Sequence, residues 1–198
     1  MTTTGFDLDM TLIDSRPGIR AVYEQLVVES GATIDTELVV SRLGPPVEWE
    51  LAHWMPDSEV GRWADRYREL YPTIAVDLVE ALPGARAAVD AARSLGRVVV
   101  VTAKHGPNAE LHLDRLGIVV DAVHGRAWRE GKADVLLAEA ADVYVGDHVH
   151  DMEAARLSRA TGVGVSTGPC SADELRGAGA AHVVSTLVDL PAWLAQHR

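Results

Sequence analysis

Two carboxylates stand close together near the start of the chain, in the stretch Gly5-Phe6-Asp7-Leu8-Asp9. In an extended segment, period-two alternation puts Asp7 and Asp9 on one side of the backbone. Phe6 and Leu8 then point the other way, toward a core. Two carboxylates held this close resist joint ionisation, so they share a proton, bind a cation or stay in water.

Such a pair can divide the work of phosphoryl transfer. One carboxylate, beside a divalent cation, acts as a nucleophile, while the other gives a proton to the leaving group and later takes one from water. The transition state also needs a metal ion and fixed positive charge. An isolated Asp-x-Asp is more often a turn with solvated side chains, so the catalytic interpretation needs partners elsewhere in the chain.

Length and composition limit the classes of protein. The 198 residues suit one domain, or one domain with a modest insertion. The net charge of -11 disfavours nucleic acid or an anionic membrane as partner. We find no apolar leader or membrane-spanning run, and the lone Cys170 allows neither an internal disulfide nor a zinc cluster. A cytoplasmic protein is expected.

The first part of the chain is predicted to be mainly helical. A short strand is expected around Phe6 and Leu8, and a helix follows from the N-cap Ser15 to Gly31. Residues 16–82 show helices and turns without a convincing strand, and a helical stripe ends there at Pro72.

After residue 84 the pattern becomes a regular alternation of helix and strand. Such spacing implies an α/β fold with a doubly wound parallel sheet and helices on both faces. The expected elements are helix 85–95, strand 97–102, helix 107–117, strand 122–124, helix 133–140, strand 143–145, helix 152–159, strand 162–165, a helix after Ser171 and strand 182–184.

Polar residues follow three of these strands, and ligands of open parallel sheets bind outside the carboxyl ends of the strands. A hydroxyl and free N–H groups can hold phosphate oxygens, a lysine neutralises them, and carboxylates bind a hard cation. The segments concerned are Asp7 with Asp9, Thr102-Ala103-Lys104 and Gly146-Asp147 to Asp151, with Lys132 before the third strand.

Together these residues resemble the haloacid dehalogenase-like hydrolase superfamily, and specifically its phosphatases related to phosphoglycolate phosphatase. Residues 6–15 resemble the first motif of that family, Val101-Thr102-Ala103 the second, Lys132 the third and residues 146–151 the fourth. The resemblance spans nearly the whole chain. It implies a Rossmann-like core of residues 1–15 and 83–198, with a helical cap inserted at residues 16–82.

The resemblance also implies roles for individual residues. Asp7 would be the nucleophile that forms an aspartyl-phosphate, and Asp9 the general acid and base. The phosphoryl group would be held by Thr102, Ala103 and Lys132; Mg²⁺ by Asp7, Asp9, Asp147 and Asp151; and substrate contacts would involve Thr11, Arg42, Gly44 and Lys104. The substrate would be a small phosphorylated metabolite, and the protein a monomer or homodimer.

Three features depart from the family pattern. Met10 stands where a glycine is usual, and backbone strain is expected if φ is positive there. The segment from Lys132 to Asp147 is short and leaves room for only a small helix, and Lys104 is a rival to Lys132 as phosphate ligand. The first strand is unusually polar.

Alternative interpretations stay open at this point. The chain could be a phosphomutase, a phospho-accepting signalling module, or a binding protein that has lost catalysis. His148 and His150 flank Asp147 but lack a cluster of metal-binding partners. Arg20 and Glu50 are further polar groups expected near the distal end of a substrate.

Overall fold

The computed structural model describes residues 2–197, and its centre is a six-stranded sheet in which every neighbouring pair is parallel. The strand order is β5-β4-β1-β6-β7-β8, so the chain starts in the middle and winds outward in both directions. The predicted doubly wound parallel sheet is confirmed. The strands are β1 (Thr2–Phe6), β4 (Gly96–Val101), β5 (Ala122–His124), β6 (Val143–Gly146), β7 (Thr161–Val165) and β8 (His182–Val184).

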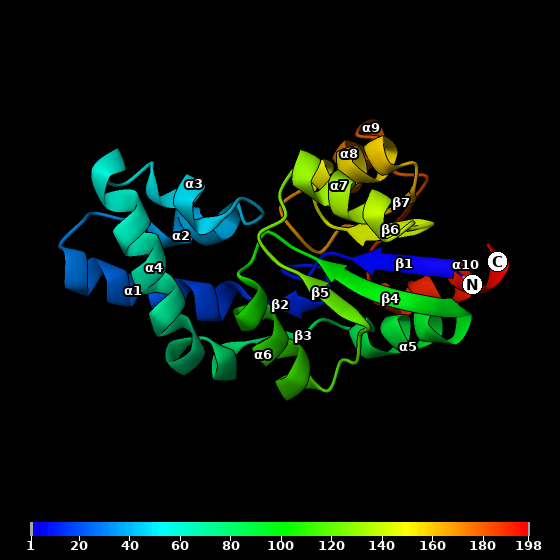
Figure 1. The fold of residues 1–198 in the computed structure, drawn as a ribbon, viewed down its shortest axis with the longest axis horizontal. Coiled ribbons are helices and arrows are strands. Elements are labelled where there is room, and N and C mark those ends of the chain that lie inside the picture. Colours follow the sequence, from blue (N-terminus) through cyan, green and yellow to red (C-terminus); the bar gives the residue numbers. More distant parts are fainter. Residues whose placement is uncertain (1, 198) are drawn as a thin grey trace.

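Helices cover both faces of this sheet (Figure 1). In β4, Val98 and Val100 pack into one hydrophobic cluster, and Val99 and Val101 into another on the opposite face. This explains why the strand reads as a continuous β-branched run. The first face packs on α5 (Ala85–Leu95), α6 (Gly106–Leu116) and α10 (Leu190–Gln196), and the second on α7 (Glu130–Ala138) and α8 (Val149–Ser158).

A separate group of helices lies beyond one end of the sheet (Figure 1). It has its own buried cluster, in which the rings of Tyr23, Tyr67 and Tyr71 lie within 5.5 Å of their neighbours. We call this group the helical region. It consists of α1 (Arg16–Ser30), α2 (Thr36–Ser41), α3 (Val47–Leu51) and α4 (Asp57–Ile74), followed by the 3-10 turn η1 (Val76–Leu78).

The prediction of no strand within residues 16–82 is wrong. Strand β3 (Glu80–Ala81) pairs antiparallel with β2 (Ile13–Asp14), and the pair forms a ribbon where the chain leaves and re-enters the sheet domain. Two-residue strands are too short to show a periodicity, so the pattern could not reveal them.

Helix α4 and strand β1 end at other residues than predicted, and two further elements were not predicted. Helix α4 continues past Pro72 to Ile74, because an exposed proline in the last turn removes only one hydrogen bond. Strand β1 ends at Phe6, and Leu8 is buried in the loop that follows. The 3-10 turn η2 (Leu187–Asp189) and α10 were not expected at all.

The remaining helix, α9 (Ala172–Gly177), begins as its sequence predicts. The Ser171 hydroxyl accepts a hydrogen bond from Glu174 N, and the Glu174 carboxylate accepts one from Ser171 N. This reciprocal cap satisfies donors that the first turn would otherwise leave open.

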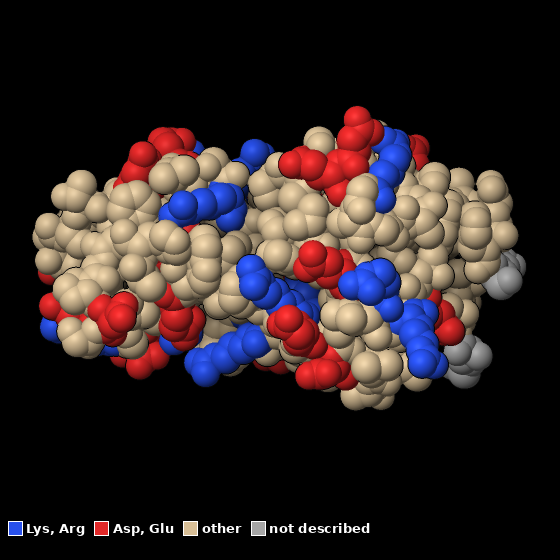
Figure 2. Space-filling view, turned by 90° about the horizontal axis from the view of Figure 1, so that it is seen from above, with Lys and Arg blue, Asp and Glu red and all other residues tan. Residues whose placement is uncertain are grey.

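Acidic and basic side chains are interspersed over the face seen in Figure 2, with no continuous basic surface. Within residues 2–197, the helices are all too short or too polar to cross a membrane.

Candidate active site

Three buried carboxylates meet at the carboxyl edge of the sheet. Asp7 follows β1, Asp147 follows β6, and Asp151 lies in the first turn of α8. One oxygen atom from each lies within 4.8 Å of those from the other two. The parallel topology therefore brings together residues that are 140 positions apart in the chain, as the strand-end argument predicts.

Lys132 is in the first turn of α7, and its side chain lies among these carboxylates. Its Nζ donates to Asp7 Oδ1 at 2.8 Å and to Asp151 Oδ1 at 2.6 Å. Burial alone would lower the pKa of Lys132, but Asp151 and Asp7 hold it well above its usual value. The lysine is therefore fully charged and bonded to the predicted nucleophile.

One lysine does not neutralise three carboxylates. Burial raises the pKa of Asp7 to about 7 even though Lys132 opposes the shift. Burial and the neighbouring Asp7 and Asp151 also raise the pKa of Asp147 well above its usual value. A hard divalent cation would remove this excess of negative charge, and carboxylate oxygens are the ligands it prefers.

The backbone around the carboxylates leaves no room for larger residues. A side chain at Gly168 would place its Cβ 1.7 Å from Asp147 Oδ2, and one at Gly146 would lie 2.4 Å from Asp151 Oδ2. The Thr11 hydroxyl donates to Asp147 Oδ1 at 2.7 Å. The donor set is thus fixed and all-oxygen, which fits Mg²⁺.

Asp9 is held separately by Lys104. Burial would raise the pKa of Asp9, but the ion pair with Lys104 lowers it, with a distance of 2.8 Å from Nζ to Oδ1. The ammonium also lies 4.6 Å from the centre of the Tyr71 ring. Lys104, predicted as a rival phosphate ligand, is therefore bonded to the second carboxylate of the motif.

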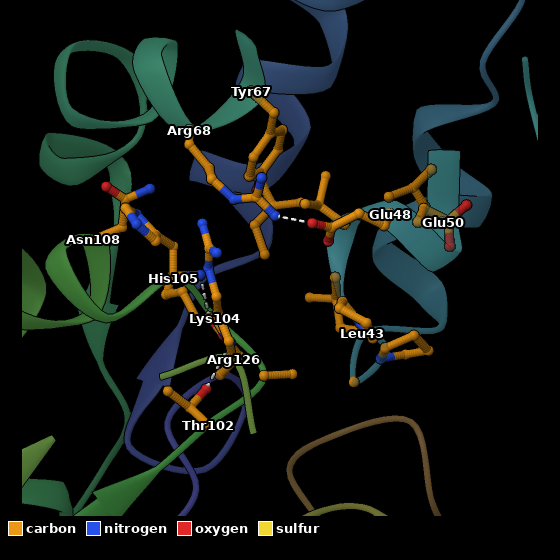
Figure 3. A pocket seen from close by; sticks show the side chains of 18 of the residues that line it. Leu43, Glu48, Glu50, Tyr67, Arg68, Thr102, Lys104, His105, Asn108 and Arg126 are labelled. Atoms are coloured by element: carbon orange, nitrogen blue, oxygen red, sulfur yellow. Dashed lines mark hydrogen bonds and ion pairs between the residues drawn. The ribbon is translucent and has the colours of Figure 1, made fainter. Parts of the chain in front are cut away.

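A cavity of about 260 Å³ opens between the sheet edge and the helical region (Figure 3). Asp7, Asp9, Thr102, Ala103 and Lys104 line it from the sheet side. From the helical region, the predicted residues Arg42, Gly44 and Glu50 line it as well. Arg42 donates to Glu50 at 2.7 Å and 3.0 Å, so these two face the cavity as a pair.

Other predicted residues lie elsewhere. Lys132, Asp147, Asp151 and Thr11 are outside the cavity lining and support it from behind Asp7. Arg20 is paired with Glu37 at 2.8 Å and does not line the cavity, so its expected position near a substrate is wrong. Arg20 is half-buried and Glu37 is exposed.

The two histidines of the fourth motif have structural roles. His148 Nδ1 accepts from His150 N at 3.2 Å, and Asp151 Oδ2 accepts from His148 N at 3.0 Å, which caps α8. His150 Nδ1 lies 2.9 Å from Glu153 Oε2. The metal-capable cluster found among residues 2–197 contains aspartates alone.

Met10 adopts the left-handed backbone conformation that a glycine would favour. Its φ is 60°, and the side chain is buried at 3% exposure. Met10 N donates to Ile13 O at 2.8 Å, and the Thr167 hydroxyl donates to Met10 O at 2.6 Å. These bonds hold the strained loop in place, as the departure from the family pattern led us to expect.

The cavity residues that the motif analysis did not assign to the site include Glu48, Arg68, Asn108 and Arg126. Arg126 had a usable signal, because it stands two residues after the predicted strand 122–124, at the same edge of the sheet. Arg68 had none, since the helical stripe of α4 does not say which exposed turn faces a cavity.

The doubly wound sheet and the acidic site at its carboxyl edge place the chain among the α/β enzymes. The model of the haloacid dehalogenase-like hydrolase family matches residues 4–156, and the chain belongs to that family. No curated protein sequence matches it.

Solved structures share the fold over almost the entire chain. A haloacid dehalogenase-like hydrolase from Streptococcus pneumoniae is similar with a TM-score of 0.84 and 20% identity, covering 98% of each chain. A hydrolase from Pseudomonas syringae has a TM-score of 0.80 and 24% identity over 99% of each chain. A protein described as a predicted phosphoglycolate phosphatase from Haemophilus somnus has a TM-score of 0.81 and 17% identity, and the match covers 98% of this chain and 97% of its own.

Proposed function

We propose that this protein is a magnesium-dependent phosphatase that hydrolyses a small phosphorylated metabolite through an aspartyl-phosphate on Asp7. The observation that carries the proposal is the position of Asp7, which lines the cavity on one side and meets Asp147, Asp151 and Lys132 on the other. A similar fold in a protein named as a phosphoglycolate phosphatase supports the reaction class.

The metal site of the proposal consists of Asp7, Asp147 and Asp151, with the Asp9 carbonyl as a further ligand. Bound Mg²⁺ would neutralise charge on the phosphoryl oxygens in the transition state. The excess of buried negative charge and the all-oxygen donor set support this assignment.

The side chains of this chain supply the remaining steps. Asp7 attacks phosphorus and the bond to the leaving oxygen breaks, while Asp9 gives that oxygen a proton. Because the ion pair with Lys104 favours the ionised form of Asp9, this step requires the bound substrate to draw Lys104 away from Asp9. Asp9 then takes a proton from the water that attacks the aspartyl-phosphate. Lys132 opposes the rise in the pKa of Asp7, and bound Mg²⁺ would favour the ionised form further. Thr102 and Ala103 would hold the phosphoryl oxygens.

The helical region, within residues 16–82, is proposed as the cap that covers the substrate. Arg42, Gly44 and Lys104 line the cavity and would contact the part of the substrate that is not transferred. The cavity volume of about 260 Å³ favours a small metabolite rather than a phosphorylated polymer. We further propose that the protein is a monomer or homodimer and is located in the cytoplasm.

A panel of phosphate esters tests the function. With Mg²⁺ the purified protein should release phosphate from at least one ester, and a chelator should abolish the release. If the protein releases no phosphate from any ester of a broad panel with Mg²⁺, the result would contradict the proposal and favour a binding protein that has lost catalysis.

A phosphomutase is the second possibility. A structure named as a β-phosphoglucomutase from Bacteroides vulgatus shares the fold with a TM-score of 0.74 and 17% identity, covering 99% of this chain and 89% of its own. A mutase would need a sugar bisphosphate as activator and would return product as an isomer, whereas the proposed phosphatase releases inorganic phosphate without an activator.

A further inference from the structure

The cationic side chains that line the cavity are paired with carboxylates, with one exception. Arg42 is bonded to Glu50, Lys104 to Asp9, and Arg68 to Glu48 and Asp65. Arg126 also lines the cavity, but it forms no ion pair with any carboxylate of residues 2–197. It is therefore the cavity cation that remains available to a ligand.

Backbone hydrogen bonds join the segment of Arg126 to the loop of residues 102–104, which would hold the phosphoryl group in the proposed function. Its N–H donates to Lys104 O at 2.8 Å, and Ala127 N donates to Thr102 O at 2.9 Å. A side chain at Gly125 would place its Cβ 2.3 Å from Gly106 N, so this close approach of two loops requires glycine there.

Arg126 itself has a φ of 59°, a conformation that a residue with a side chain adopts only when its surroundings impose it. The surroundings here are the two backbone hydrogen bonds to the Thr102–Lys104 loop. The position of Arg126 is thus tied to the loop that would hold the transferred phosphoryl group.

The neighbours of Arg126 leave its charge uncompensated. Figure 3 shows His105 and Asn108 on the same side of the cavity, with Glu48 and Glu50 on the opposite side. Burial, and then the charges of Arg126 and Arg68, lower the pKa of His105, so its ring is neutral near pH 7. Asn108 is buried at 3% exposure and adds a neutral amide.

We propose that Arg126, with His105 and Asn108 beside it, binds a second anionic group of the substrate. Either a carboxylate or a second phosphate has the required charge, and the guanidinium can bind both in a bidentate manner. The carboxylates of Glu48 and Glu50 on the opposite side disfavour an anion there. The inference rests on the proposed phosphatase function, which it extends from any small ester to esters with two anionic groups.

Paired esters test the subsite. Phosphoglycolate is compared with hydroxyethyl phosphate for a carboxylate, and a hexose bisphosphate with the hexose monophosphate for a phosphate. For one pair the wild-type protein should show kcat/KM about tenfold or more higher for the doubly anionic ester. Arg126→Gln should reduce that ratio about tenfold, mainly through KM, and Arg126→Lys should retain part of it.

Arg156→Gln is the matched control. Arg156 is exposed on α8, lies outside the cavity and forms no ion pair with residues 2–197, so its loss removes the same net charge and should leave the ratio unchanged. A wild-type ratio near one in both pairs, or an unchanged ratio in Arg126→Gln, would overturn the subsite.

A binding measurement separates this inference from the proposed function. The same esters are titrated calorimetrically into Asp7→Asn protein with and without Arg126→Gln. Hydrolysis without a preference for the doubly anionic ester would agree with the proposed phosphatase function and overturn the subsite. Preferential binding that depends on Arg126, in a wild-type protein that hydrolyses nothing, would support the subsite and overturn the phosphatase.

Discussion

The environment of Lys132 makes it the residue on which the metal-free site depends. Its side chain is buried at 6% exposure between Asp7 and Asp151, and the third carboxylate, Asp147, is close by. Removing one partner of a buried ion pair leaves an uncompensated charge in a medium that solvates it poorly. The neighbouring carboxylates would then have to take up protons or the local structure would have to open.

Lys132→Met should therefore lower the free energy of unfolding of the metal-free protein by about 3–5 kcal/mol. Urea unfolding in a chelator measures the loss. Arg97→Met is a control, because the ion pair of Arg97 with Glu139 is at the surface and its loss should cost less than about 1 kcal/mol. Equal losses in the two variants would contradict the account of the site.

Binding of Mg²⁺ should stabilise the fold more as the pH rises. The pKa of Asp7 is raised from 3.8 to about 7 in the folded protein, so between these values the unfolded chain binds fewer protons and stability falls with rising pH. A bound cation removes this loss because it favours the ionised form.

The increase in Tm caused by Mg²⁺ should accordingly be larger at about pH 8 than at about pH 5, as differential scanning calorimetry can measure. The histidines affect both samples of each pair equally, so the difference isolates the carboxylates. An increase that is the same at both pH values would show that Asp7 is not part of the cation site.

Motif residues were predictable from the sequence because strand ends converge whatever the detailed packing. Asp7, Thr102 and Asp147 lie at the predicted edge of the sheet. The pairing of Lys104 with Asp9 was not predictable, because both a phosphate oxygen and a carboxylate satisfy a lysine. The distances between side chains decide that choice, and they depend on the fold.

At the level of elements, the loop after β7 supports the acidic site from outside the family motifs. Gly168 leaves the space that Asp147 fills, and neighbouring Thr167 bonds to Met10 O. This loop thus touches both the first and the fourth motif. Its position controls where the Asp147 oxygen atoms lie.

Gly168→Ala should weaken Mg²⁺ binding about 10- to 100-fold, because the added Cβ would lie 1.7 Å from Asp147 Oδ2 and must displace it. Calorimetric titration of Mg²⁺ measures the change. Gly177→Ala is the matched control, since nothing lies within 4 Å of an added Cβ there and α9 gains a better helix former. Unchanged affinity in Gly168→Ala would mean that Asp147 is not a ligand.

The sheet strands and their connecting helices were predictable because long buried runs and capped helices carry strong periodic signals. The β2–β3 ribbon and α10 were missed, as each is short and depends on a partner distant in the sequence. The extension of α4 past Pro72 was missed because a proline is a helix stop only where its missing hydrogen bond matters.

On the scale of the whole molecule, the helical region and the sheet domain meet at a buried polar contact. Tyr71 of α4 and His112 of α6 are both fully buried, with 3.0 Å between the Tyr71 hydroxyl and His112 Nε2. Burial lowers the pKa of His112 to about 4, so the ring is neutral at physiological pH. The relative position of the two parts was not predictable, because no local pattern encodes a contact across 41 residues.

Tyr71→Phe should lower the free energy of unfolding by about 1–3 kcal/mol, because it leaves His112 Nε2 buried without a partner. Chemical denaturation measures the loss. Tyr67→Phe serves as the control, since the Tyr67 hydroxyl makes no hydrogen bond to residues 2–197, and its removal should change stability by less than about 1 kcal/mol. Similar effects in both variants would argue against a specific contact between the two parts.

The central claim is that Asp7 carries the phosphoryl group. The most direct measurement is an acid quench of Asp9→Asn protein with Mg²⁺ and an aryl phosphate, followed by mass mapping of the peptides. An aryl leaving group needs little acid catalysis, whereas hydrolysis of the intermediate needs Asp9, so the aspartyl-phosphate should accumulate. The account predicts one phosphoryl group on the peptide that contains Asp7, and none when Asp7→Asn is added. Phosphate release without any labelled peptide, or a label on another residue, would contradict it.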